Sequence, residues 1–568
     1  MNRPEELMRI TMTYGSNKPY EPSRPCEPDR PLPSSPRELI VIARPEARLR
    51  VTDNGITSRS HFDVSFLNAL LRKPGRSLRP LFRPGKESPT CGDDHRRIAG
   101  DVAPPDLSVY FRLFAPDKEL DSIARQLCGQ PVIDTAYVKP GAVPPASDAG
   151  IIRGDGPPKL RNGFAPEASL SPGTLKVRSP RVPRMSIFLD TVSKALFKIA
   201  RRLRPVSGLA QGYLGEPPEG IGARAVWESY QGGDGAGVTI IDIEGGWNFS
   251  HEDLQVNQGG LVGGIQSNVS DWTEHGTAVL GIIGGDKNAF GVTGVCPGAM
   301  VQVVGAVDQS SITTSLGIAA AIQFAADRLS PGDIILIELQ LPGPKLNFQL
   351  NAGRSQEGYI PVEWWDDQLS AIRYATNRGV IVVEAGGNGG EELDDRIYDN
   401  NPSVTGIQFG SQWQNPFRRG PADSGAIIVG AGGAPMWTHG ISSNVDRSRM
   451  EFSNFGSMFD AQGWGEHVET CGGPGEVLLS DQAGENVLYT KLFGGTSSAA
   501  AMVAGALGCI QGARKGAGLA PLTPAQARAL LRREDLGSPQ QDGDVTLVGE
   551  RIGSRPNLLK MIAEVIPQ

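Results

Sequence analysis

Five short, continuously apolar segments recur in the second half of the sequence, with helix-like segments between them. The apolar segments are 238–241, 301–304, 334–337, 380–383 and 426–429, and the helix-like segments are 277–283, 316–326 and 367–376. Strands that are apolar along their whole length are buried on both faces, which is typical of a parallel sheet covered by helices. We therefore expect an α/β fold in this part of the chain.

The run of small residues at 495–505 predicts a buried helix. Thr496 and Ser497 follow two glycines, and no charged residue interrupts the run until Arg514. A helix that is apolar all round has no face for water and has to lie in the core. Its first turn offers free N–H groups and the positive end of the helix dipole. Ser497 is therefore either part of a capped core helix or a nucleophile beside a site for negative charge.

Composition excludes several classes of protein. The 568 residues carry 55 basic and 62 acidic side chains, a net charge of −7, which does not indicate a nucleic-acid partner. The six cysteines are scattered without a CxxC pair, which argues against a zinc module and a disulfide-dense secreted scaffold. No window is long and apolar enough for a transmembrane segment. The N-terminal residues lack the pattern of a signal peptide, so a cytoplasmic location is favoured over secretion.

Changes in composition divide the chain into four parts. Residues 1–36 are rich in proline and serine and predict a disordered tail. Residues 37–139 predict a small α+β domain, and residues 208–568 form the large α/β domain. The linker 140–207 is rich in proline and glycine and contains a basic amphipathic helix at 187–204, which packs on a neighbouring domain or binds a membrane surface.

The small domain has recognisable elements of both kinds. Strands are expected at 39–43, 107–114 and 132–138, a helix at 117–127, and a loop at 85–101. The order β-α-β-β-α-β results if residues 79–82 supply the second strand. At the other end of the chain, Thr523, Pro524 and Gln526 predict a helix start with a capping box.

Three polar residues lie where a site at the carboxyl ends of parallel strands is built. Asp242 follows the strand that ends in Ile241, His275 begins a helical segment, and Ser497 opens the small-residue helix. An aspartate, a histidine and a serine in this order are the components of a catalytic triad.

Four segments in this order resemble motifs of the subtilisin-like (subtilase) serine proteases. They are Ile241-Asp242 with 251–254 (HEDL), 275–277 (HGT) with 291–297 (GVTGVCP), 382–390 (VVEAGGNGG) and 495–499 (GTSSA). The resemblance implies a subtilisin-like parallel sheet with helices on both faces. It further implies a serine endopeptidase that acts on polypeptides through an acyl-enzyme and requires no cofactor.

The resemblance also assigns roles to residues. Asp242 would orient His275, His275 would take the proton of Ser497, and Asn388 would donate to the oxyanion. The substrate groove would include Glu338, Leu339, Gln340 and Gly386. Because the chain has ELQLP at 338–342 where the family has Ser-Leu-Gly-Gly, we expect Gln340 and Leu341 to narrow the groove or to reshape its edge-pairing with substrate. If Glu338 faces the primary pocket, it would favour a basic residue before the cut bond. The insertion at 347–365 is either a lid or a packed surface element.

Two further features follow from the same resemblance. Asp253 and Asn288 match positions at which many subtilases bind calcium, so a structural calcium ion is possible, although two side chains are a thin ligand set. Residues 37–139 resemble the ferredoxin-like propeptide of these enzymes, with 136–140 as the tail that lies in the groove. We expect a zymogen that cuts its own linker; the alternative is an unrelated N-terminal domain.

Two competing functions have to be considered. Ala501 replaces a proline that the family carries soon after the nucleophile, which leaves room for an impaired pseudoprotease that acts as a peptide-binding scaffold. An α/β-hydrolase esterase needs a GxSxG motif and the order Ser, Asp, His, and the chain has neither.

Overall fold

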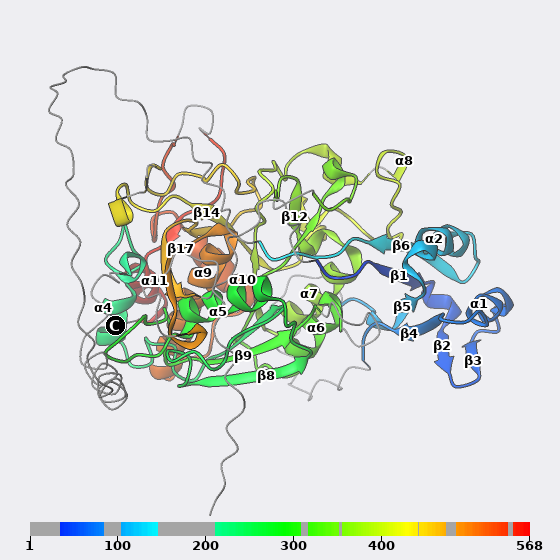
Figure 1. The fold of residues 1–568 in the computed structure, drawn as a ribbon, viewed down its shortest axis with the longest axis horizontal. Coiled ribbons are helices and arrows are strands. Elements are labelled where there is room, and N and C mark those ends of the chain that lie inside the picture. The colour runs from blue at the N-terminus through cyan, green and yellow to red at the C-terminus, as the bar shows by residue number, and fades with distance from the viewer. Residues whose placement is uncertain are drawn as a thin grey trace, which may run out of the picture.

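The computed structural model describes residues 34–83, 104–145, 211–307, 316–351, 355–400, 402–440, 442, 444–472, 484–543 and 549–567. Two units are visible in Figure 1, a small N-terminal unit in blue and cyan and a larger unit that contains the rest of the chain. The predicted tail up to residue 33, the loop 85–101 and the basic helix 187–204 lie outside the described residues.

The N-terminal unit is an antiparallel four-stranded sheet in the order β4-β5-β1-β6, with two helices. Its elements are β1 (Glu38–Ala43), β2 (Leu49–Thr52), β3 (Gly55–Ser58), α1 (Ser65–Leu71), β4 (Ser77–Pro80), β5 (Tyr110–Phe114), α2 (Leu120–Cys128) and β6 (Ile133–Lys139). Strands β2 and β3 form a separate hairpin. The second strand begins two residues earlier than expected, and the order β-α-β-β-α-β is present.

The larger unit contains a seven-stranded parallel sheet in the order β15-β14-β13-β10-β7-β9-β8. The strands are β7 (Thr239–Glu244), β8 (Gln258–Gly264), β9 (Met300–Gly305), β10 (Ile334–Ile337), β13 (Ile381–Ala385), β14 (Ile427–Gly432) and β15 (Ala461–Trp464). Strand β7 lies in the middle of the sheet, between β10 and β9. All five apolar segments of the sequence fall in or directly before these strands, which confirms the predicted α/β class.

Helices cover both faces of this sheet. One face packs against α5 (Ser270–Gly284) and α9 (Gly495–Gly516), with α4 (Ala223–Ser229), α10 (Pro524–Leu531) and α11 (Leu558–Val565) around them. The other face packs against α6 (Ile318–Ala326) and α7 (Asp366–Asn377). A short helix, α8 (Pro402–Thr405), lies at the surface. Among the described residues, none of these helices is long and apolar enough to cross a membrane.

Three small antiparallel pairs complete the larger unit. They are β11 (Gln340–Pro342) with β12 (Tyr359–Pro361), β16 (Val468–Cys471) with β17 (Tyr489–Phe493), and β18 (Gly537–Ser538) with β19 (Arg555–Pro556). The insertion 347–365 supplies β12 and the buried Trp364 and Trp365, so its described part is packed structure.

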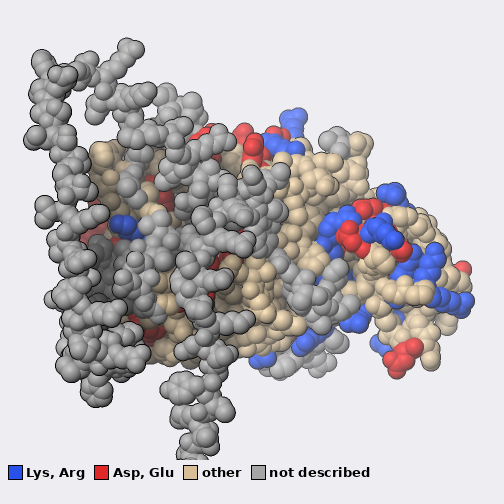
Figure 2. All heavy atoms as spheres, in the orientation of Figure 1, with Lys and Arg blue, Asp and Glu red and all other residues tan. Residues whose placement is uncertain are grey.

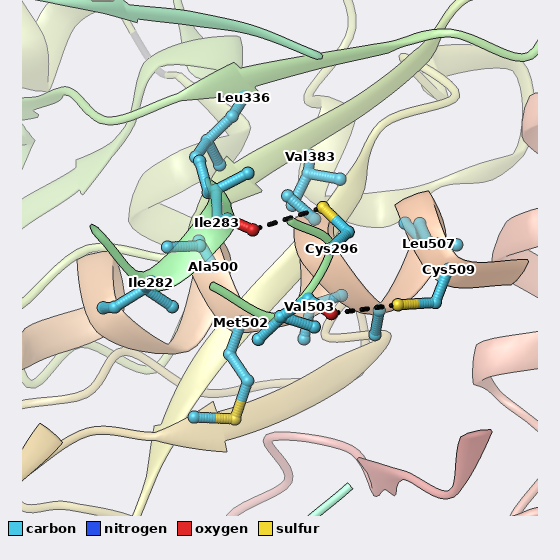
Figure 3. Packing of buried hydrophobic residues seen from close by; sticks show 14 of the residues in the cluster. Ile282, Ile283, Cys296, Leu336, Val383, Ala500, Met502, Val503, Leu507 and Cys509 are labelled. Carbon is cyan, nitrogen blue, oxygen red and sulfur yellow. Dashed lines mark hydrogen bonds between the residues drawn. The ribbon is translucent and has the colours of Figure 1, made fainter. Parts of the chain in front are cut away.

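Helix α9 lies in the centre of the core, as its composition predicts. Figure 3 shows Ala500, Met502, Val503 and Leu507 packed among side chains of α5 and of the central strands. Small residues let other segments approach closely: a Cβ on Gly505 would lie 2.6 Å from Val295. The helix is continuous through Ala501, which is fully buried. The first turn of α9 is therefore held rigidly at the edge of the sheet.

The N-terminal unit contacts the larger unit through buried charges. Lys139 of β6 lies within 3.0 Å of Glu38 and 2.5 Å of Asp367, and all three side chains are buried. Tyr137 donates to Asp367, and Tyr110 donates to Asp366, at the start of α7. Figure 2 shows that the outer surface of this unit carries most of the basic side chains visible on that face of the molecule. The interface thus combines a wholly buried ion pair with neutral hydroxyl contacts.

Candidate active site

The nucleophile candidate and its base lie in direct contact. Ser497 is the third residue of α9, and its Oγ lies 2.9 Å from Nε2 of His275, which lies inside α5. Both side chains are buried, and the His275 ring packs edge-on against Phe493 at 5.5 Å. The sequence prediction that these two residues meet agrees with the structure, and the distance suits proton transfer from serine to histidine.

The acidic partner of His275 differs from the prediction. Nδ1 of His275 is hydrogen-bonded to Oε1 of Glu244, the last residue of β7, and not to Asp242. Asp242 instead accepts a hydrogen bond of 2.7 Å from the indole N–H of Trp247, and its Oδ1 has no hydrogen-bond partner among the described residues. Residues 242 and 244 point to the same face of the strand. The structure therefore gives the orienting position to the second of the two acids.

Glu338 also differs from its expected position. It follows β10 directly, donates its backbone N–H to Ile243, and is fully buried. Burial raises the pKa of its carboxyl, and the negative charges of Asp242 and Glu244 raise it further, while the Ser497 hydroxyl opposes them. Because its neighbours are Ser497 and two other carboxyls, Glu338 does not face an open pocket as a charge for a basic side chain. The position of Glu338 therefore does not support a preference for a basic residue before the cut bond.

The three buried carboxyls all favour the protonated form. Burial raises the pKa of Asp242, Glu244 and Glu338 well above the usual range. Oδ1 of Asp242, Oε2 of Glu244 and both oxygens of Glu338 lack a donor among the described residues. An unpaired buried carboxylate is costly, which is a second reason for these groups to be protonated. Of the three carboxyls, Glu244 is the one that is hydrogen-bonded to His275.

Asn388 is fixed so that its amide N–H points toward Ser497. Its Oδ1 accepts from the backbone N–H of Thr496 at 2.9 Å and from the Thr496 hydroxyl at 2.8 Å. Its Nδ2 donates to Oε1 of Gln356 at 3.1 Å and to the carbonyl oxygen of Pro145 at 2.8 Å. The predicted oxyanion donor thus lies beside the predicted nucleophile.

The chain itself occupies the site. The carbonyl oxygen of Pro145 lies 2.9 Å from Ser497 Oγ as well as 2.8 Å from Asn388 Nδ2. Two residues earlier, Val143 and Gln340 exchange backbone hydrogen bonds of 3.0 Å in both directions. Val143 therefore forms an antiparallel bridge with Gln340 of β11, the kind of edge pairing by which extended peptides bind to sheets. The segment in the groove lies just beyond the predicted tail 136–140, whose last strand residues belong to β6.

The other groove residues have distinct roles. Leu339 is buried in the core on the side of α6 and α7 and does not line the groove. Gln340 is fully buried; its Oε1 accepts from the backbone N–H of Asn388 at 2.8 Å, and its Nε2 donates to Gln356. Gly386 leaves no room for a side chain, because a Cβ would lie 2.4 Å from Phe459. The side chain of Gln340 thus reaches Asn388, and narrowing of the groove stays a prediction.

The residues suggested for calcium do not fit a metal ion. Asp253 Oδ1 accepts from Asn288 Nδ2 at 2.6 Å, and Oδ2 accepts from the backbone N–H of Val292 at 2.7 Å. Asn288 Oδ1 accepts from the N–H of Phe290. All the oxygens that calcium would need are thus paired with donors, and burial raises the pKa of Asp253 to about 6. Within the described ranges no cluster of three or more His, Cys, Asp or Glu side chains is arranged for a metal ion.

Two residues of the site carry no sequence signal strong enough to find them. Glu244 lies two positions after Asp242, and strand alternation places both on the same face, so only the structure shows which one reaches His275. Gln356 belongs to the insertion and matches no motif. The contact of Pro145 with Ser497 depends on the register in which Val143 pairs with Gln340 of β11, and the linker sequence does not specify that register.

Comparisons with known proteins agree with this geometry. The sequence model of the subtilase family matches residues 233–548. Subtilisin BL of Lederbergia lenta is 25% identical over 280 residues, 49% of this chain and 77% of that protein. Thermitase of Thermoactinomyces vulgaris is 31% identical over 179 residues, 30% of this chain and 54% of that protein.

A third relative is matched over a smaller share of its own length. The thermophilic serine proteinase of Bacillus sp. (strain AK1) is 27% identical over 205 residues, which cover 35% of this chain and 44% of that protein. The chain thus spans less than half of that relative. The family model, by contrast, matches more than half of this chain and includes His275, Asn388 and Ser497. The chain belongs to the subtilase family.

Proposed function

We propose that the protein is a serine endopeptidase made as a zymogen, with Glu244, His275 and Ser497 as its triad. The observation that carries this proposal is the carbonyl of Pro145, which lies between Ser497 Oγ and Asn388 Nδ2 while His275 contacts the same Oγ. A peptide carbonyl beside a nucleophile, a base and an oxyanion donor is the arrangement that acyl transfer requires. The substrate class is polypeptide.

The reaction uses side chains of the chain and water. Ser497 Oγ attacks the carbonyl carbon as His275 Nε2 takes its proton, and Glu244 holds the ring and stabilises the charge that forms on it. Asn388 donates to the developing oxyanion. Its side chain is already oriented by two hydrogen bonds from Thr496 to its Oδ1. His275 then protonates the leaving nitrogen, and water releases the acyl group from Ser497.

The N-terminal unit is the proposed inhibitor of the zymogen. Its β6 continues into residues 141–145, which pair with β11 and fill the site (Figure 1). Ser35 holds the other edge of this segment, since the N–H of Ala142 donates to Ser35 Oγ at 2.8 Å and the N–H of Ser35 donates to the carbonyl of Ala142. A substrate cannot enter until this segment leaves the groove.

Labelling with a fluorophosphonate probe tests the activity. Purified protein whose linker has been cut is expected to take up one probe at Ser497, and Ser497→Ala is expected to take up none. Ser498→Ala is the matched control, because this neighbouring hydroxyl donates to the carbonyl of Trp464 and not to His275. Absence of label on folded protein would contradict the proposal and favour a peptide-binding scaffold.

A further inference from the structure

The register of the bound segment identifies one peptide bond. Ser497 Oγ and Asn388 Nδ2 both contact the carbonyl oxygen of Pro145, so the acyl group that would pass to Ser497 is that of Pro145. The pairing of Val143 with Gln340 and of Ala142 with Ser35 fixes the segment on both edges. The bond in position for attack is therefore Pro145–Ala146, and the residue before it is a proline.

A buried set of hydrogen bonds adjoins the carbonyl of Pro145. Pro145 is buried, and Asn388 Nδ2, which donates to its carbonyl, also donates to Gln356 Oε1. The amide of Gln340 accepts from the N–H of Asn388 at 2.8 Å and donates to Gln356 Oε1 at 2.5 Å. Gln340 and Gln356 are both buried. Gln340 is therefore joined to the group that contacts the Pro145 carbonyl.

Proline also fits the hydrogen bonds of the segment. Pro144 and Pro145 have no N–H groups, so the last backbone donor that the segment presents to β11 is that of Val143, and it is satisfied by Gln340. The segment therefore has no unsatisfied backbone N–H at positions 143–145, which is compatible with a proline before the cut bond.

We propose that the enzyme cleaves after proline, with Gln340 as the residue that determines this specificity, and that its first substrate is its own Pro145–Ala146 bond. This rests on the proposed endopeptidase function. Ser497 Oγ bonds to the Pro145 carbonyl carbon and its proton moves to His275. The bond to the Ala146 nitrogen breaks and that nitrogen takes the proton, and water then releases Pro145 as a carboxylate and restores Ser497.

Peptides with the sequence of residues 142–148 and either Pro, Ala, Phe or Arg at position 145 test the specificity. The expected kcat/KM for Pro exceeds that for Phe and Arg by about tenfold or more, because the larger side chains would have to displace the buried side chain of Gln340. Gln340→Gly, which removes this side chain, is expected to raise cleavage of the Phe peptide relative to the Pro peptide. Gln340→Ala is a second, milder variant that is expected to change the ratio in the same direction.

Mass spectrometry of the wild-type protein gives an independent result. The large fragment is expected to begin at Ala146, and Ser497→Ala is expected to stay uncut. A Ser497-dependent cut at another bond, or cleavage of the Phe or Arg peptide as fast as the Pro peptide, would overturn the proline specificity alone. Failure of the fluorophosphonate probe to label Ser497, with no peptide cleaved, would instead overturn the proposed endopeptidase function.

Discussion

Glu244 and His275 form the hydrogen bond that a triad needs, and Asp242, two residues earlier on the same strand face, does not take part in it. A glutamate at the end of β7 reaches further than an aspartate within it. Asp242 Oδ2 is bonded to the indole of Trp247, whereas Nδ1 of His275 is bonded to Glu244. The acid that orients His275 is therefore set by strand position and side-chain length together.

Asn388→Ala tests the oxyanion donor. Its Nδ2 is the side-chain donor that lies 2.8 Å from the Pro145 carbonyl. Loss of one such donor lowers kcat by about 10²–10³-fold in enzymes of this mechanism. We expect this decrease in kcat for peptide cleavage with little change in KM. A KM effect with unchanged kcat would mean that Asn388 only binds the ground state.

Removal of Lys139 tests the buried ion pair between the two units. In a Ser497→Ala background, Lys139→Met is expected to destabilise the full chain by about 3–5 kcal/mol, because Asp367 then lacks its buried cation, whereas Glu38 keeps Arg112. Arg37→Met is the matched control: its pairs with Asp117 and Asp121 are exposed and contribute about 0–1 kcal/mol. Equal shifts in denaturant midpoint for the two variants would contradict this account.

Asp366 makes the contact of the N-terminal unit dependent on pH. Burial raises the pKa of Asp366 to about 6, and Tyr110 of the N-terminal unit is one of the residues that covers it. Departure of the unit removes the part of this burial that the unit supplies, so the pKa of Asp366 falls toward about 3.9, and loss of the Tyr110 hydrogen bond opposes part of this fall. Binding therefore takes up a proton. The affinity is full below about pH 4 and falls as pH rises through about 6, by up to about 3 kcal/mol.

Size-exclusion chromatography of the cut protein at several pH values checks this linkage. The N-terminal unit is expected to co-elute with the larger unit at pH 5 and to separate more readily at pH 8. Asp366→Asn removes the titrating group and is expected to flatten the dependence. Stronger association at pH 8 than at pH 5 would show that the sign is wrong.

Calcium is not expected to stabilise the protein through Asp253 and Asn288. Their oxygens already accept hydrogen bonds from protein donors. Addition of calcium should change the Tm of the wild type and of Asn288→Ala by the same amount. A calcium-dependent rise in Tm that Asn288→Ala abolishes would contradict the structure.

Much of the fold follows from local patterns in the sequence. The continuous apolar segments predict the parallel sheet, and the small residues of 495–505 predict a buried α9. The motifs around His275, Asn388 and Ser497 predict residues that the structure brings together. The choice between Asp242 and Glu244 depends on distances across the sheet, which alternation does not encode. The position of Pro145 depends on the register of a proline-rich linker, and Gln356 comes from an insertion without a motif.

Self-cleavage of Glu244→Gln and Asp242→Asn, measured by pulse labelling during cell-free synthesis, tests the central claim most directly. If Glu244 orients His275, the rate for Glu244→Gln falls by about 10⁴-fold, as when the acid of a triad is neutralised. The rate for Asp242→Asn is then expected to stay within about tenfold of the wild type, because Asp242 contacts Trp247 and not the histidine. A 10⁴-fold loss in Asp242→Asn with near-normal cleavage by Glu244→Gln would contradict the assignment.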